Sequence, residues 1–268
     1  MEPINWYKQL AGEPLYPDII WSLPENKSSS GKLTIIGGNQ FGFGAPGNAY
    51  TAAQSTGAGV VQVLLPDGIK KVVKTILPDA EFAPSTPSGS FARKALDSLL
   101  SLSSWSDGVL LAGDLGRNSE TAMMLETYVE KYKGPLTITQ DAVEYFKETP
   151  LQLVDRANTL IVLSLGQLQK MFINTPSIIP ITLGMGSLQL LEALQSYTKE
   201  HSCMIVTMHN DLLYVASGGD VSTTKTTKDI WRVETAAVAA VLWMQVPSKP
   251  FQAITTAMLP ELAELRSA

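Results

Sequence analysis

Residues 33–67 read LTIIGGNQFGFGAPGNAYTAAQSTGAGVVQVLLPD and decide the expected fold. The run at 33–36 is short and apolar and ends in glycines, as a buried parallel strand does where it breaks into a loop. Helix-forming residues follow at 48–56, and a β-branched run follows at 60–65. We therefore expect a strand, a glycine loop, a helix and a second strand. In such a unit, backbone N–H groups and a helix N-terminus can face an anion.

The composition is that of a globular chain that forms one large α/β domain. Its 268 residues are 45% hydrophobic and 17% charged, which suits a folded core rather than a disordered segment. The net charge of −5 argues against a general affinity for nucleic acid or anionic membranes. The single cysteine, Cys203, rules out an internal disulfide and fits a reducing cytoplasm, where we expect a small apolar residue in a strand. The first residues lack the pattern of a secretion signal, and no apolar run has the length that spans a bilayer.

Apolar strands alternate with helical segments along the rest of the chain. This order predicts right-handed crossovers and a mostly parallel sheet with helices on both faces, in a single domain over 1–268. Residues 1–31 contain several prolines and are expected to form an irregular lead-in, with Trp6, Tyr16 and Trp21 available to pack on a neighbouring element. The other expected strands lie at 109–112, 135–139, 160–163 and 204–207, with a hairpin of 212–216 and 221–226. The other expected helices lie at 70–76, 88–102, 119–131, 168–172, 187–199, 230–244 and 251–259, and 78–87 is expected to be a loop.

The expected ligand site lies at the carboxyl ends of the parallel strands. Ligands of open α/β sheets bind in the crevice beyond those ends. The loops that share this rim are expected to follow Ile36, Ala112, Thr139, Leu163 and Thr207. The glycine loop is the first of them, so it is the first candidate for contact with a phosphorylated ligand.

The glycine loop also matches the dinucleotide-binding pattern. Residues 42–47 fit G-x-G-x-x-G, and Asp67 lies twenty residues beyond the last of these glycines. However, residues 37–41 separate the strand from the first glycine of the match, and Pro46 stands where the helix should already be running. Asp67 lies in a Pro-Asp-Gly sequence and is expected to be a turn residue. The SSSGK run at 28–32 lacks the P-loop spacing and precedes the strand, so it is expected to be a polar turn.

A longer pattern covers residues 37–60, which carry GGN, then GAP, then AA, then GAGV. It resembles the first motif of the ADP/ATP-dependent NAD(P)H-hydrate dehydratases of the ribokinase-like superfamily, which runs G-G-S-x-x-Y-x-G-A-P…A-A…R-x-G-A-G-L-V. The stretch DGVLLAGDLGR at 107–117 resembles a strand followed by G-P-G-L-G-R. The stretch PLTITQDAV at 135–143 resembles P-L-V-L-D-A-D-A-L. The resemblance implies a ribokinase-like three-layer α/β sandwich.

The resemblance also implies an activity and its site. The family repairs hydrated NAD(P)H by eliminating water, coupled to cleavage of ADP or ATP with Mg²⁺. The resemblance implies a small-molecule nucleotide partner and, as in many members, a homo-oligomer, while the reducing environment that Cys203 fits indicates a cytoplasmic location. For Asp141 two roles stay open, a carboxylate near the Mg²⁺ and phosphates or a helix N-cap. The implied substrate contacts are Gly38, Asn39, Ala45, Gly116 and Asp141, with Ser164 in the place of a histidine, and the implied nucleotide contacts are Thr207, His209 and Arg232.

The chain departs from the family at the helix that should hold the phosphates. Alignment of AAVL at 239–242 with the family's A-A-L-L places Asp229 and Arg232 on the Gly-Ser-Gly-Asp motif, with Arg232 on the catalytic aspartate. Arginine cannot act as a base at neutral pH. Bulky Ile230 and Trp231 would hinder close approach of backbone N–H groups to a phosphate. Asp229 is left as the candidate catalytic base, or as the cap of the helix that follows.

Three functions therefore stay open. The first is a dehydratase, impaired to the extent that the lost base matters, since removal of a positioned base typically costs about 10²–10⁴-fold in rate. The second is a protein that holds a nucleotide on the same fold without turnover, with Arg232 contacting phosphate directly. The third is a small-molecule kinase of the same superfamily, which would also need an aspartate base at that helix.

Overall fold

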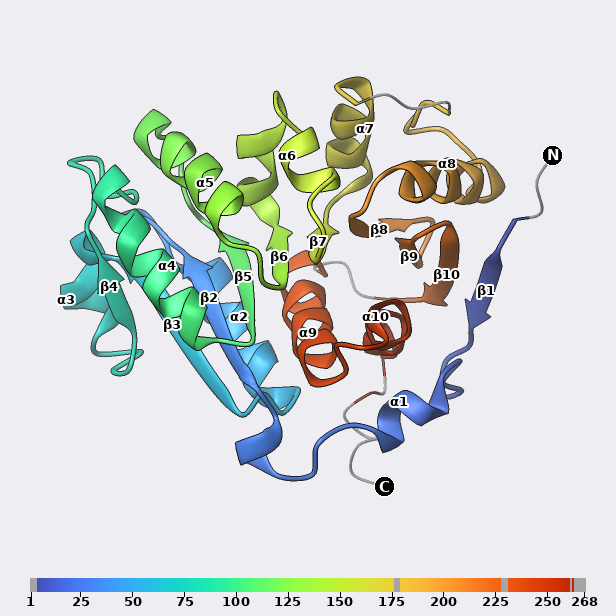
Figure 1. The fold of residues 1–268 in the computed structure, drawn as a ribbon, viewed down its shortest axis with the longest axis horizontal. Helices are drawn as coiled ribbons and strands as arrows, with labels where there is room; N and C mark the ends of the chain where they lie inside the picture. Colours follow the sequence, from blue (N-terminus) through green and yellow to red (C-terminus); the bar gives the residue numbers. More distant parts are fainter. Residues whose placement is uncertain (1–3, 176–178, 228–230, 261, 263–268) are drawn as a thin grey trace.

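The computed structural model describes residues 4–175, 179–227, 231–260 and 262. Their strands form one ten-stranded sheet in the order β1-β10-β9-β8-β7-β6-β5-β2-β3-β4 (Figure 1). All neighbours are parallel except the two pairs that β9 makes with β8 and β10. The mostly parallel sheet predicted from the sequence is thus confirmed. The strands are β1 (Trp6–Gln9), β2 (Lys32–Gly37), β3 (Val60–Pro66), β4 (Glu81–Ala83), β5 (Gly108–Gly113), β6 (Leu136–Thr139), β7 (Thr159–Val162), β8 (Met204–His209), β9 (Leu212–Ser217) and β10 (Asp220–Lys225).

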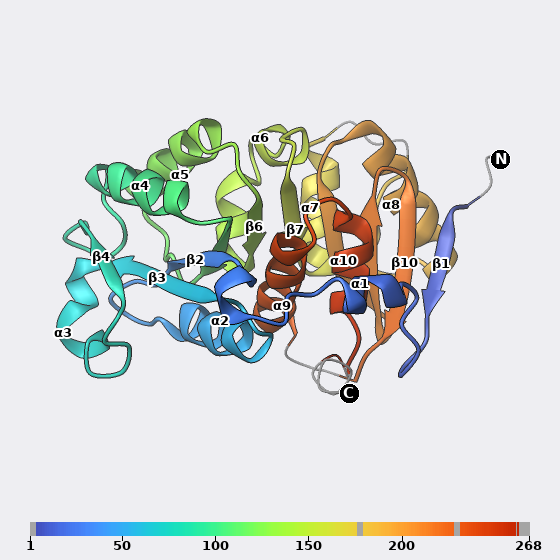
Figure 2. The same ribbon diagram turned by 60° about the horizontal axis from the view of Figure 1, so that its bottom comes forward.

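Helices cover both faces of the sheet. Leu125 of α5 and Leu190 of α8 belong to the buried apolar cluster on one face. Ala49 of α2 and Ala236 of α9 belong to the cluster on the other face, and Figure 2 shows α2 and α9 on the opposite side of the sheet from α4 and α5. No helix within the described residues is long and apolar enough to cross a membrane. The helices are α1 (Pro17–Trp21), α2 (Gly44–Ser55), α3 (Lys70–Val73), α4 (Leu96–Trp105), α5 (Ser119–Lys131), α6 (Leu151–Val154), α7 (Leu165–Ile173), α8 (Ser187–Glu200), α9 (Arg232–Gln245) and α10 (Pro250–Ala257).

The unit that opens the sequence argument forms as expected, with one shift. β2 is buried in all but its first residue, which agrees with its largely apolar sequence and its place in the middle of the sheet. α2 begins at Gly44, four residues before the predicted start, because Pro46 is tolerated in a first helical turn. Ala49 and Ala53 of α2 are fully buried in the cluster that also contains α9. Their small side chains allow the two helices to lie close together beneath the rim.

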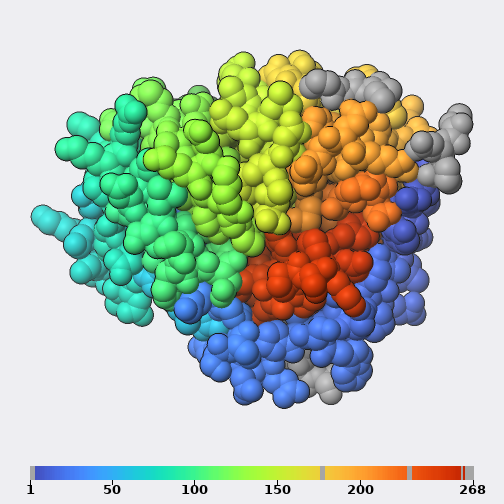
Figure 3. All heavy atoms as spheres, in the orientation of Figure 1, coloured from blue at the N-terminus to red at the C-terminus, as the bar shows by residue number. Residues whose placement is uncertain are grey.

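The N-terminal segment is more regular than expected. β1 pairs in parallel with β10 and extends the sheet by one strand. The side chain of Trp6 donates to Thr223 Oγ1 at 2.9 Å, Tyr16 packs edge-on against Phe251 of α10, and Trp21 is left 87% exposed. Figure 3 shows this segment, in blue, lying against the red C-terminal helices. β1 and β10 are separated by more than 200 residues of chain, and such pairing leaves no local sequence signal. The sequence therefore predicted an irregular lead-in where the structure has a strand.

Other boundaries differ where tertiary contacts override local pattern. The expected loop at 78–87 contains the edge strand β4. The helix expected at 88–102 is α4, which begins only at Leu96 after a short 3₁₀ turn. The hairpin of β9 and β10 is confirmed, with antiparallel pairing across a turn at 218–219. Cys203 lies directly before β8 and is buried, and burial raises the pKa of its thiol to about 12, as suits an inert core residue.

Candidate functional site

The rim of the sheet is built on close approach of two backbones. β2 ends at Gly37, where a side chain would collide with the carbonyl oxygen of Gly113 and would lie 2.7 Å from Cγ of Pro46. Gly38 has φ +85° and donates its N–H to the Gly113 carbonyl at 3.0 Å. Glycine is required here because a Cβ has neither the space nor the backbone freedom. The ends of β2 and β5 are thereby joined, and the loop that follows is directed over the rim.

Asn39 fixes the turn that follows. Its side-chain amide donates to the backbone carbonyl of Asp114, and its Oδ1 accepts the N–H of Phe41 at 2.7 Å. A backbone bond of 2.9 Å from Asn39 to Gly42 closes the turn, and Phe41 stands 88% exposed at its tip. Asn39 is itself buried. The Asn39 amide thus holds the shape of the predicted substrate loop, and the side chain that this loop exposes is the phenyl ring of Phe41.

Asp114 lies at the centre of the rim, and the sequence argument did not select it. Its Oδ2 accepts the N–H of Ala45, in the first turn of α2, at 2.7 Å. A carboxylate is favoured at a helix N-terminus by the unpaired N–H groups and the helix dipole. Asp114 adopts φ +56°, a conformation that a non-glycine residue rarely takes. The signal in the sequence was its position, since it stands on the second glycine of the G-P-G-L-G-R pattern.

Asp141 follows β6 and faces the end of β5. Its Oδ2 accepts the N–H of Gly116 at 3.2 Å, whereas its Oδ1 is buried with no hydrogen-bond partner among the described residues. Burial of the carboxyl raises its pKa; the bond from Gly116 opposes this rise, and the charge of Asp114 adds to it. Asp141 lies inside the 3₁₀ turn Gln140–Phe146, which begins after Thr139, so it is not the N-cap that one of the two sequence interpretations gave it.

Gly116 and Asp141 line the same open hollow, which has a volume of about 780 Å³. The start of α5 and the turn at 140–146 form its walls, and Arg117, Glu144 and Lys170 bring charge to it. The sequence placed two predicted substrate contacts, Gly116 and Asp141, about 25 residues apart on two loops, and the fold brings them together. Its volume falls within the range of small-molecule sites, and most of the side chains that line it are polar or charged.

Ser164 and Arg232 meet beside this hollow through Gln167. Ser164 is the N-cap of α7 and forms a capping box with Gln167, so its hydroxyl serves the helix end. Gln167 Nε2 donates to the Gln140 carbonyl at 2.8 Å, and Arg232 Nη1 donates to Gln167 Oε1 at 3.0 Å. Arg232, the first residue of α9, is partly buried, and this burial lowers its pKa. Arg232 is thus tied through Gln167 to the loop end of β6.

Thr207 and His209, two of the predicted nucleotide contacts, are not bonded to Ser164, Gln167 or Arg232 within the described residues. Thr207 is fully buried in β8. His209 Nε2 lies 2.9 Å from the Met185 carbonyl and 3.0 Å from the side-chain amide of Asn210. No hydrogen bond or ion pair among the described residues joins either of them to Arg232. Asp229 lies outside the described residues.

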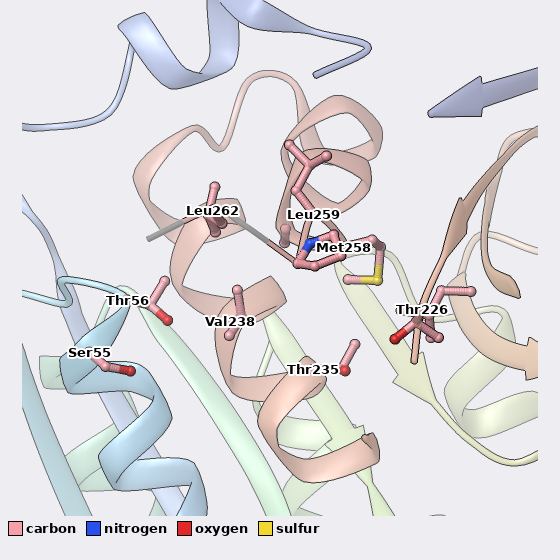
Figure 4. Close-up of a pocket in the computed structure, with 11 residues that line it drawn as sticks. Ser55, Thr56, Thr226, Thr235, Val238, Met258, Leu259 and Leu262 are labelled. Carbon is pink, nitrogen blue, oxygen red and sulfur yellow. The ribbon is translucent and has the colours of Figure 1, made fainter. Parts of the chain in front are cut away.

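A second hollow, of about 150 Å³, lies beside α9 (Figure 4). Thr235 and Val238 of α9, Thr56 after α2, and Thr226 after β10 line it together with the chain that follows α10. Figure 4 shows these side chains gathered around α9 and the chain that follows α10. Hydroxyl side chains and aliphatic side chains both line this hollow. The sequence contains only a weak signal for this hollow, which is the spacing of Thr235 and Val238 on one helix face.

Comparison with known proteins gives a family and a fold. The family model for NAD(P)H-hydrate dehydratase matches residues 33–232. A bifunctional NAD(P)H-hydrate repair enzyme of Methanothermobacter thermautotrophicus is 29% identical over 121 residues, and its counterpart in Moorella thermoacetica is 29% identical over 120 residues. Each match covers 44% of this chain and 23% of the relative, so the chain aligns with only about a quarter of these longer proteins.

Solved structures share the fold along the whole chain. A ribokinase-like superfamily protein of Enterococcus faecalis has a TM-score of 0.70 at 15% identity. The match covers 100% of this chain and 95% of that protein's chain. An ADP/ATP-dependent NAD(P)H-hydrate dehydratase of Bacillus subtilis, co-crystallised with ATP and Mg²⁺, has a TM-score of 0.61 at 15% identity, with coverage of 95% and 96%. These likenesses establish the ribokinase-like sandwich that the motifs implied.

Proposed function

The chain belongs to the NAD(P)H-hydrate dehydratase family, and we propose that it eliminates water from a hydrated nicotinamide dinucleotide at the rim formed by β2, β5 and β6. One observation carries the proposal. Gly116 and Asp141, which the family motifs imply near the substrate, line one open hollow. The glycine loop reaches the same loop end through the bond from Asn39 to Asp114. A site at the carboxyl ends of parallel strands is where this class of sheet binds ligands.

In this proposal the substrate rests largely against backbone. Gly38 and Gly116 have positive φ, and a side chain at Gly116 would lie 3.0 Å from Ser90 Oγ. Bare backbone lets a flat ring approach closely. Ala45 lies at the first turn of α2, and its N–H is already taken by Asp114. Asn39 shapes the loop, and Asp141 offers the polar group that meets the hydrated ring.

The nucleotide belongs, in this proposal, to the start of α9. Arg232 supplies a charge at a helix N-terminus, where the dipole also favours an anion, so it contacts the phosphates. The hollow beside Thr226 and Thr235 lies about one helical turn further along α9. Of the predicted nucleotide contacts, Arg232 is the one that this arrangement uses.

Mg²⁺ would come to the site with the nucleotide. Among the described residues, no three His, Cys, Asp or Glu side chains gather as metal ligands. Mg²⁺ commonly keeps several waters and binds through substrate phosphates with one or two carboxylates. If Arg232 holds the nucleotide, Mg²⁺ would be bound to the nucleotide phosphates, where the ion would neutralise their charge.

The test is to incubate the protein with hydrated NADH, with and without ADP or ATP and Mg²⁺, and to follow recovery of the reduced-nicotinamide absorbance. The proposal predicts recovery that is faster than in buffer alone. Absence of any acceleration would refute it. Formation of ADP from ATP in the presence of small alcohols, without recovery of NADH, would favour a kinase instead.

A second candidate, a protein that holds a nucleotide without turnover, is favoured by the arginine at the start of α9. It predicts thermal stabilisation by ADP or ATP with no recovery of NADH. A ligand present at 100 times its Kd stabilises the folded state by about 2.7 kcal/mol, a shift that a melting curve resolves. The variant Arg232→Gln should lose most of this stabilisation, whereas Arg93→Gln, at a site remote from α9, should keep it.

A further inference from the structure

Phe41 projects from the rim of the sheet into solvent. It is 88% exposed, although its turn follows directly after the buried strand β2. A single exposed apolar side chain is ordinary on a protein surface, and Trp21 of α1 is exposed to almost the same degree. What sets Phe41 apart is its place at the carboxyl end of a parallel strand, where sheets of this class bind ligands, together with the bracing of its turn.

The turn that carries Phe41 is held by hydrogen bonds at each of its residues. Asn39 and Gly42 exchange backbone bonds of 2.9 and 3.2 Å, and the N–H of Phe41 donates to Asn39 Oδ1 at 2.7 Å. The N–H of Gln40 donates to the Gly89 carbonyl at 3.0 Å. A Cβ at Gly89 would collide with Cβ of Gln40, so only glycine allows the two backbones to meet so closely. A fixed backbone therefore presents the phenyl ring, and ordering this ring on a ligand costs less conformational entropy.

The loop that braces the turn of Phe41 also supports the hollow at Gly116. Within this loop, Oγ of Ser88 accepts from the side-chain amide of Asn118 at 2.8 Å. Asn118 and Gly116 both line the hollow. From the side of the turn, Nδ2 of Asn39 would lie 3.5 Å from a Cβ at Gly116. The turn of Phe41 therefore stands at the edge of the hollow, and the two share their supports.

The neighbours of Phe41 in the loop leave its ring uncovered. A Cβ at Gly42 would meet no atom within 4 Å outside its chain neighbours in the described part of the chain, so the space beside Gly42 is open. Phe43, the other aromatic residue of the loop, packs against the buried apolar cluster that contains α2 and α9. The family motif has a tyrosine where this chain has Gly42, so Phe41 supplies the exposed aromatic ring of this turn from the preceding position. One aromatic ring thus anchors the loop, and the loop presents the other.

We propose that Phe41 stacks on the nicotinamide ring of the dinucleotide while that ring lies against Gly116, an inference that rests on the proposed function. Bare backbone on one side and a phenyl ring on the other form a slot for a thin ring. Elimination of water converts two tetrahedral carbons of the hydrated ring into the trigonal carbons of a double bond, so the ring becomes flatter. The stack therefore holds the ring more tightly as the reaction proceeds, and Phe41 selects planar nicotinamide rings.

NADH is a direct probe of the stack, because one molecule carries a nicotinamide ring and an adenine ring. In proton NMR spectra of NADH with the wild-type protein, the nicotinamide resonances should move upfield through the ring current of Phe41. The variant Phe41→Leu keeps apolar volume without a ring and should lose this shift.

Kinetics with hydrated NADH, ADP or ATP, and Mg²⁺ give the second measurement. For Phe41→Ala, kcat/KM should fall about 5–150-fold, the loss typical when alanine replaces an aromatic side chain on which a base stacks. Phe41→Tyr keeps the ring and should retain most of the wild-type value. The matched control is Trp21→Ala, which removes an almost equally exposed ring from α1 and should leave kcat/KM unchanged.

The outcomes separate this inference from the proposed function. Equal kcat/KM for the wild type and Phe41→Ala would overturn the stack and leave the dehydratase standing. Absence of turnover in the wild type would overturn the proposed function, and the NADH spectra would still decide on the stack. Absence of a nicotinamide shift, a shift confined to the adenine resonances, or a nicotinamide shift that persists in Phe41→Leu would each overturn the stack. Because Phe41 is exposed, its variants should melt at the wild-type temperature, and melting curves check that each is folded.

Discussion

Gly113→Ala tests the closeness of the strand ends on which the site depends. Gly113 is the last residue of β5, and its carbonyl accepts the N–H of Gly38 from the end of β2. An added methyl would lie 2.6 Å from Cβ of Gln140 and 2.9 Å from Oδ1 of Asp141. Both contacts are shorter than real Cβ contacts, and the φ of +107° is one that alanine rarely adopts. The substitution therefore forces the backbone to change or the loop after β6 to move.

The size of the effect follows from these two costs. The backbone conformation costs about 1–3 kcal/mol, and crowding of a packed region costs about 1–3 kcal/mol. The free energy of unfolding should therefore fall by about 2–6 kcal/mol, a large part of the roughly 5–15 kcal/mol typical of a domain. Displacement of Gln140 should also disturb its carbonyl, which accepts from Gln167, and so reach Arg232.

Urea unfolding followed by circular dichroism measures this change as a shift of the midpoint. The matched control is Gly47→Ala in the first turns of α2, where a Cβ meets no atom within 4 Å. That variant should be stabilised by about 0.5–1 kcal/mol, because alanine favours a helix over glycine. An unchanged midpoint for Gly113→Ala would show that the strand ends are not held as close as described, and the proposed contact of Asp141 with the substrate would lose its geometric basis.

Three further perturbations have defined outcomes. The guanidinium of Arg156 donates to backbone carbonyls of the loops before β6 and β7. Arg156→Lys should therefore lower the free energy of unfolding in urea by about 2–4 kcal/mol. Lys147→Arg, at an exposed position, is the control. Tyr128→Phe removes a buried hydroxyl that lies 2.6 Å from Ser103 Oγ and should cost about 0.5–1.5 kcal/mol in thermal unfolding. The pKa of Asp141 is raised above the ordinary 3.8 on folding, so the folded state binds its proton more tightly, and stability should fall as pH rises from that value through the raised pKa. Asp141→Asn should remove this slope from pH-dependent denaturation curves. An identical slope in both proteins would contradict a raised pKa of Asp141 in the folded state.

Much of the fold could be predicted from local pattern, because local pattern reports burial. The apolar runs that became β2 and β3 and the helix between them follow from residues within 35 positions of one another. The hairpin of β9 and β10 follows from two alternating segments around adjacent glycines. The family motifs carry the same kind of short-range information, and they led to Gly38, Gly116 and Asp141 before the arrangement of the strands was known.

The sequence by itself therefore determined the alternation of strands and helices, the glycine loop and the family. Only the tertiary structure decided that β1 extends the sheet, that Asp114 occupies the start of α2, and that Gly116 and Asp141 share one hollow. It also decided that Arg232 reaches the end of β6 through Gln167. The physical reason is that these contacts join residues from different strand ends. Their closeness depends on the order of strands in the sheet, and no periodicity along the chain records that order.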